Sequence, residues 1–182
     1  MKKVSKYFLL LAIAGLIFIS CQNSESAKAA DSNSAAASDS NESPINYPYT
    51  IKNPDNWETG SRQNTLVALS ALKAWETGNM DESIKYFADS VEVRFEGISK
   101  KVSKDTLRVL ISPDKTVKSI AIRMVDWQSS VSKDKTDEWV SLWYMQYGEG
   151  VNGKKDSIDV FNDIKLKDGK IIRLDEFRRK LH

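Results

Sequence analysis

The feature of this sequence that most constrains its fold is a change in the spacing of its apolar residues. Between residues 61 and 112, apolar side chains recur every three or four positions, which is typical of helices. From residue 119 to residue 177 they alternate with polar side chains, which indicates strands. Helices followed by successive strands predict an α+β domain, in which the helices pack on one face of an antiparallel sheet.

Three helices and one short strand are expected in the first part. Residues 61–76 predict the first helix, and Asn79 is placed to cap a second one. Residues 91–95 alternate as a short strand. Residues 103–112 predict a third helix, which Pro113 closes.

The second part predicts four strands in succession. Two dipeptides between them, Asn152-Gly153 and Asp168-Gly169, are typical of tight hairpin turns with positive φ angles. Such turns join antiparallel neighbours, so the strands should form a meander. The expected strands are residues 119–131, 139–147, 157–166 and 170–177.

The N-terminus predicts export. Lysines precede Phe8–Ile19, a run of twelve residues without a polar side chain, and Ser20 and Cys21 follow directly. The run is shorter than the roughly 20 residues that a membrane-spanning helix needs. Residues 18–21, Phe-Ile-Ser-Cys, resemble the lipobox of bacterial lipoproteins. That resemblance implies a signal peptide over residues 1–20, cut before an acylated Cys21; the alternative is an ordinary signal peptide with an incidental cysteine.

Composition limits the chemistry of the exported chain. The chain has 27 basic and 25 acidic side chains, and removal of the signal leaves 24 against 25, a net charge of −1. This balance does not favour nucleic-acid binding, and membrane contact is left to the acyl chains on Cys21. One cysteine and one histidine, His182, argue against a disulfide, a metal site or histidine-based catalysis. No cofactor motif is present.

Three segments follow the signal peptide. Residues 21–44 hold the anchor and a tether rich in serine and alanine, which has no large apolar side chain to bury. Residues 45–56 carry two prolines and predict an extended arm that packs onto the domain. Residues 57–182 form the folded domain. A lipid-anchored protein of the bacterial cell envelope is expected, with the outer membrane favoured, on its periplasmic or surface side.

The order of elements resembles a known family. Residues 74–81 (Ala-Trp-Glu-Thr-Gly-Asn-Met-Asp) and 86–91 (Tyr-Phe-Ala-Asp-Ser-Val) are similar to the opening of SnoaL-like domains, and residues 161–171 to their closing hairpin. These domains belong to the nuclear transport factor 2-like superfamily. The resemblance implies a cone: a strongly curved sheet wrapped around the first helix, with a pocket inside.

Polar residues on otherwise apolar strand faces are the candidates for that pocket. Asn162 interrupts the face formed by Ile158, Val160, Ile164 and Leu166, and a buried amide needs a partner. By the same alternation Tyr144 and Gln146 should line the mouth of the cone. Asp126 follows three apolar positions and is a further candidate, either as a pocket carboxylate or as a solvated strand end.

Three tryptophans, Trp127, Trp139 and Trp143, are expected on the opposite face of the sheet. A sheet that is apolar on both faces needs a second cover. Dimerisation through this face, which the resemblance also implies, is therefore the favoured interpretation. A stacking platform for flat ligands is the alternative.

Three functions are compatible with the sequence. The favoured one is a non-catalytic domain that binds a small apolar ligand or a partner protein. The second is a lipid-anchored enzyme of isomerase or hydrolase type. However, the strand at residues 91–94 lacks the base Asp of the ketosteroid isomerases of this superfamily, so no catalytic residue is assigned. The third is a structural module for dimerisation or docking.

Overall fold

The computed structural model describes residues 46–51 and 56–181 of the chain. The chain divides into two compact units at Pro48, and all the described helices and strands belong to the second unit. The expected signal peptide, Cys21 and the tether lie outside the described residues.

All three predicted helices are present, and each begins at a polar cap. Helix α1 spans Arg62–Glu76, helix α2 Met80–Ile84 and helix α3 Lys104–Ile111. The side chains of Ser61, Asn79 and Ser103 accept hydrogen bonds from backbone N–H groups of the first turns, which stabilises these ends. None of the helices in the described ranges is long and apolar enough to cross a membrane.

The strands form one mixed sheet in the order β1-β4-β5-β6-β7-β2-β3. Strands β4 to β7 are the predicted meander; β4, β5 and β6 extend beyond both expected ends, and β7 extends beyond its C-terminal end only. The bounds are β1 Trp57–Thr59, β2 Phe87–Phe95, β3 Ile98–Ser103, β4 Val117–Ser132, β5 Glu138–Gly150, β6 Lys155–Lys167 and β7 Lys170–Lys180.

The expectation of a wholly antiparallel sheet is wrong for one pair of neighbouring strands. Strand β2 pairs with β7 in parallel, while the other neighbours are antiparallel. Strands β1 and β3 were not predicted from the sequence. Strand β1 has only three residues, and β3 carries mainly lysine and serine, so neither shows an apolar alternation.

One of the two predicted turns has the expected geometry. Asp168 and Gly169 both have positive φ angles, 51° and 70°, as a two-residue hairpin turn of this type requires. In the Asn152-Gly153 turn only Gly153 has a positive φ angle. The loop there is longer, and the backbone N–H of Gly150 donates to the carbonyl of Lys154 across it. The predicted packing of the arm is not observed where it is described, since Tyr49 and Ile51 are exposed.

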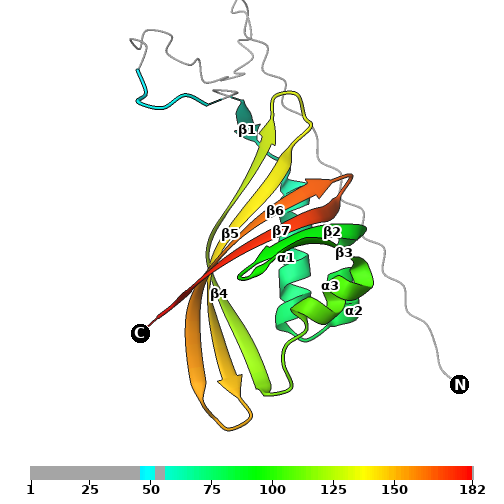
Figure 1. Ribbon diagram of the computed structural model, residues 1–182, viewed down its shortest axis with the longest axis vertical. Helices are drawn as coiled ribbons and strands as arrows, with labels where there is room; N and C mark the ends of the chain where they lie inside the picture. The colour runs from blue at the N-terminus through cyan, green and yellow to red at the C-terminus, as the bar shows by residue number, and fades with distance from the viewer. Residues whose placement is uncertain (1–45, 52–55, 182) are drawn as a thin grey trace, which may run out of the picture. The chain divides into compact units, whose positions relative to one another are not determined.

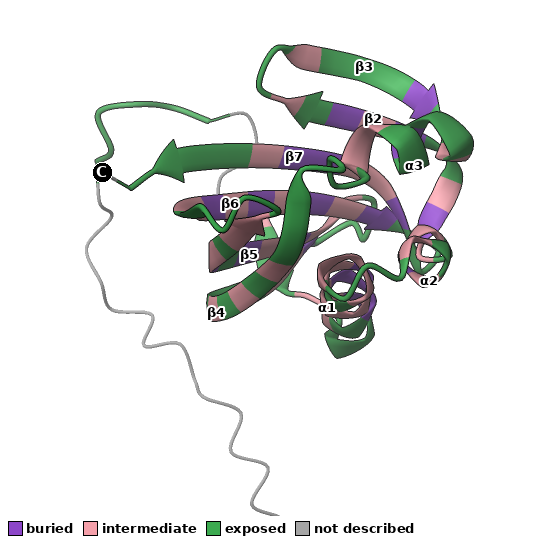
Figure 2. Cartoon of the chain, turned by 90° about the horizontal axis from the view of Figure 1, so that it is seen from below, coloured by how far each residue is buried: buried purple, intermediate pink, exposed green. Residues whose placement is uncertain are grey.

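The sheet curls around the helices, so α1, α2 and α3 lie on its concave side (Figure 2). Ala68 of α1 is fully buried against this side, together with Leu107 of α3. The concave residues of the central strands, such as Val140, Leu142 and Leu166, are the most buried part of the core. This is the α+β cone that the sequence predicts, and its hollow side holds the candidate site (Figure 1).

Candidate functional site

A cavity of about 300 Å³ lies between the concave face of the sheet and the helices. Small side chains of α1, Ala68 and Ala71, form part of its wall and leave space beneath the sheet. Apolar side chains from the helices and strands form most of the remainder, among them Leu72, Phe87 and Phe95. This size is at the lower end of the range for pockets that bind small molecules.

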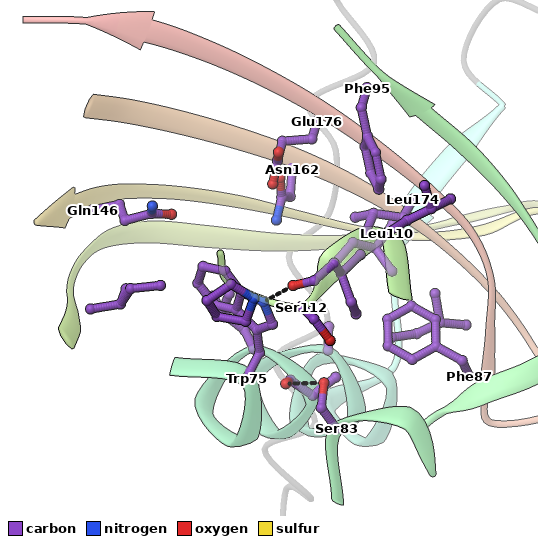
Figure 3. Close-up of a pocket in the computed structure, with 18 of the residues that line it drawn as sticks. Trp75, Ser83, Phe87, Phe95, Leu110, Ser112, Gln146, Asn162, Leu174 and Glu176 are labelled. Carbon is purple, nitrogen blue, oxygen red and sulfur yellow. Dashed lines mark hydrogen bonds between the residues drawn. The ribbon is translucent and has the colours of Figure 1, made fainter. Parts of the chain in front are cut away.

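Hydrogen bonds to backbone carbonyls fix the helical wall of the cavity. The indole Nε1 of Trp75 donates to the carbonyl of Ile111 at 2.6 Å, which ties the end of α1 to α3. The hydroxyl of Ser83 donates to the carbonyl of Ala71 at 2.9 Å, which ties α2 to α1. Both interactions are drawn in Figure 3. These two side chains therefore have their donors already engaged within the protein.

Asn162 projects from β6 into the cavity and is 4% exposed. Its Nδ2 donates to the hydroxyl of Tyr144 on β5 at 3.1 Å. Its Oδ1 is the one fully buried side-chain N or O atom of the described residues without a hydrogen-bond partner. Burial raises the pKa of Tyr144 well above its ordinary range, so the phenol keeps its proton. Gln146, the third expected pocket residue, also lines the cavity.

Glu176 is a pocket residue that the sequence reasoning missed. It lies on β7 directly opposite Asn162, and the two side chains stand next to each other in Figure 3. Burial raises the pKa of its carboxyl, while the neighbouring Arg178, whose Nε donates to it at 2.6 Å, partly offsets that effect. Leu174, Glu176 and Arg178 alternate on one face of the strand, which is the signal that could have identified this carboxyl.

The predicted positions of Asp126 and Trp127 are wrong because of a β-bulge. The register of β4 against β5 shifts between Met124 and Asp126, so the alternation inverts there. Asp126 pairs with Trp143 on the convex face, where it is exposed and accepts from the backbone N–H of Trp127 at 2.8 Å. Trp127 instead pairs with the buried Leu142 and shares the concave side.

The convex face carries a row of aromatic side chains across three strands. The rings of Trp143 and Phe161 are 5.2 Å apart, and those of Phe161 and Phe177 are 5.8 Å apart. Phe177 is 61% exposed, and the bulge residue Val125 beside the row is 62% exposed. The row (Trp143, Phe161 and Phe177) and the adjacent Val125 border a shallow hollow and leave apolar surface open to solvent.

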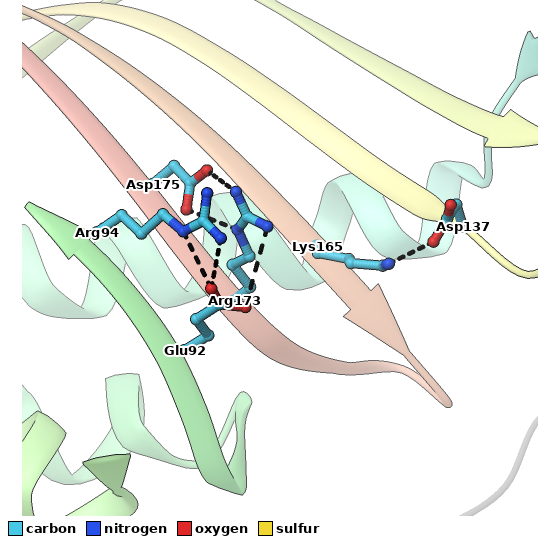
Figure 4. A network of polar contacts seen from close by, with 6 residues as sticks. All are labelled: Glu92, Arg94, Asp137, Lys165, Arg173 and Asp175. Atoms are coloured by element: carbon cyan, nitrogen blue, oxygen red, sulfur yellow. Dashed lines mark hydrogen bonds and ion pairs between the residues drawn. The ribbon is translucent and has the colours of Figure 1, made fainter. Parts of the chain in front are cut away.

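A network of charged side chains, which includes Lys165, Arg173 and Asp175, lies beside this row (Figure 4). Arg173 donates from Nε to the carboxylate of Asp175 at 2.8 Å, and Asp175 is only 7% exposed. Trp139, the third expected tryptophan, lies beneath Lys165 and Arg173, whose charged groups are 5.6 and 5.3 Å from the ring centre. Trp139 is therefore covered by cations and is not part of the open aromatic row.

No group of three or more His, Cys, Asp or Glu side chains that could hold a metal ion occurs in the part of the chain that the structure describes.

Comparisons with known proteins identify the fold. No family model and no curated protein matches the sequence. Among solved structures, AusH from Aspergillus nidulans is similar with a TM-score of 0.54 at 13% identity, covering 68% of this chain and 88% of that one. An NTF2-like protein of unknown function from Burkholderia pseudomallei has a TM-score of 0.52 at 10% identity, covering 65% and 92%.

An LEH-like epoxide hydrolase from M. tuberculosis is similar with a TM-score of 0.51 at 11% identity, covering 64% of this chain and 83% of that one. Identities this low show the fold alone. The domain therefore has the nuclear transport factor 2-like (NTF2-like) fold that the resemblance implies, and these neighbours include an epoxide hydrolase and a protein of unknown function.

Proposed function

We propose that this domain binds a small, largely apolar molecule in its cavity without catalysing a reaction on it. The observation that carries this proposal is the unpartnered Oδ1 of Asn162 in a cavity of about 300 Å³. A buried oxygen without a partner costs about 1–3 kcal/mol, and a bound molecule that donates to it would recover that cost. A purely structural module would be expected to fill its cone instead.

Catalysis is the second candidate, and one observation favours it. The side chain of Glu176 is 13% exposed and the pKa of its carboxyl is raised by partial burial, which is the property of a general acid. Two observations favour binding over catalysis. Asp126, the carboxylate expected in the pocket, lies on the other face of the sheet. Glu176 is also paired with Arg178, which stabilises its charged form.

The cavity can be tested with 2-ethylnaphthalene as an apolar probe. Gln146→Trp should fill one end of the cavity and weaken binding at least tenfold in calorimetry. Tyr147→Trp is the matched control, because Tyr147 is the next residue of β5, is 41% exposed and does not line the cavity. Equal loss in both variants, or no binding to the unaltered protein, would count against the proposal.

We also propose that Cys21 anchors the protein to the cell envelope by its acyl chains. The twelve apolar residues before Ser20-Cys21 support this proposal. Mass spectrometry of the membrane fraction should find a chain that begins at Cys21 and carries added lipid mass. Cys21→Ser should leave the precursor uncut. A soluble mature chain that begins elsewhere would contradict the anchor.

A further inference from the structure

The polar end of the cavity offers one acceptor and one donor at adjacent atoms. The hydroxyl of Tyr144 accepts from Asn162 Nδ2, so its own proton remains available to donate. The free Oδ1 of Asn162, on the same amide group, can only accept. A ligand that both donates and accepts at a single atom would therefore satisfy both groups.

Several other polar side chains of the cavity further limit the chemical class of the ligand. The donors of Trp75 and Ser83 are engaged by backbone carbonyls, and Arg178 donates to Glu176. Besides Glu176, a second carboxylate, Asp114, lines the cavity, whereas Arg178 is the one cationic side chain among its lining residues. A carboxylate on the ligand would meet like charges here without a free cation to balance it.

We propose that the natural ligand is an apolar alcohol, whose hydroxyl donates to Asn162 Oδ1 and accepts from Tyr144. This inference rests on the proposed binding function and adds the chemical class of the ligand. A ketone of the same skeleton could only accept from Tyr144, and a hydrocarbon could do neither.

Four naphthalene probes test this assignment on the full chain by calorimetry. They are 1-(2-naphthyl)ethanol, 2-acetonaphthone, 2-ethylnaphthalene and 2-naphthoate. A cavity of 150 Å³ accepts one benzene ring, so one of twice that volume suits two fused rings. The alcohol should bind about tenfold more tightly than the hydrocarbon, the ketone should lie between them, and the carboxylate should bind most weakly.

Two variants assign the two hydrogen bonds separately. Asn162→Leu should remove the preference for the alcohol over the ketone. Tyr144→Phe should remove the preference for the ketone over the hydrocarbon. The ranking of the probes on the unaltered chain does not depend on whether the variants fold.

The outcomes separate the two proposals. If the hydrocarbon binds as tightly as the alcohol, or the carboxylate binds most tightly, the alcohol assignment is wrong while binding in the cavity stands. If none of the four probes binds, the proposed function fails, and the assignment fails with it.

Discussion

The two faces of the central strands differ in whether a buried polar side chain has all its hydrogen-bond partners within the chain. On the convex face, Asp175 is buried and receives two hydrogen bonds from the guanidinium of Arg173. On the concave face, Asn162 is equally buried and leaves its Oδ1 without a partner. Asp175 therefore has its hydrogen-bond donors within the chain, whereas Oδ1 of Asn162 lacks a donor that a ligand could provide. This difference, more than apolar character, distinguishes the candidate site.

The largest expected effect comes from breaking the convex ion pair. Arg173→Met leaves Asp175 buried without its partner, which should cost about 3–5 kcal/mol of folding free energy. Urea unfolding measures the loss. Lys118→Met is the control, because it breaks an exposed pair with Glu149 and should cost less than about 1 kcal/mol. Similar small losses in both variants would mean that the Arg173 pair does not stabilise this face.

We propose that a second copy of this chain covers the open aromatic row. The second largest expected effect is therefore a loss of dimer stability when this row is changed. Trp143→Lys places a charge beside Phe161, the middle ring of the row, and should cost about 2 kcal/mol or more of dimer stability, the typical contribution of an aromatic hot-spot residue. Sedimentation of the chain without residues 1–44 measures the dissociation constant, which should rise more than tenfold. Val151→Lys, in an exposed hairpin loop, should leave it unchanged.

In a dimer, the second copy would contact the convex face, just as a bound ligand would contact the concave face. If the unaltered chain is already monomeric at high micromolar concentration, the proposed interface is wrong, and the comparison between the faces becomes sharper. The row of Trp143, Phe161 and Phe177 would then need another occupant, such as a flat ligand stacked on the rings.

The smallest expected effect concerns the pH dependence of stability. The raised pKa of Glu176 means that the folded state holds its proton more tightly than the unfolded state. Its contribution to stability is thus complete below the ordinary pKa of 4.5 and is lost as pH rises through the raised value. Relative to the unaltered chain, Glu176→Gln should therefore be more stable at pH 8 than at pH 4.

Melting temperatures measured between pH 4 and pH 8 test this prediction. Glu58→Gln is the control, because Lys135 lowers the pKa of Glu58, and that substitution should have the opposite sign. A stability difference between Glu176→Gln and the unaltered chain that does not change with pH would show that Glu176 titrates alike in both states.

The sequence predicted the parts of this fold that depend on neighbouring residues. The caps at Asn79 and Ser103 and the alternation around Asn162 are local patterns, and the structure contains all of them. The β-bulge at Val125 is different, because it arises from the pairing of β4 with β5. A single inserted residue inverts the alternation, which is why Asp126 and Trp127 were assigned to the wrong faces.

The cavity itself was predicted less completely than its strands. Asn162 and Tyr144 interrupt apolar alternations, so they could be identified from the sequence alone. Glu176 lies among Arg178, Arg179 and other charged residues near the C-terminus, which obscure its alternation with Leu174. The side chains of α1 and α3 that line the cavity could not be identified, because the packing of helices against the sheet brings them there.

The parallel pairing of β2 with β7 has a consequence for synthesis of the chain. Strand β7 comes after every other described strand in the chain, yet it lies inside the sheet between β6 and β2. Until its 11 residues leave the ribosome, the hairpin of β2 and β3 has no edge on which to dock. Strands β4 to β6 and the hairpin of β2 and β3 therefore remain separate parts of the sheet until β7 has been made and pairs with both.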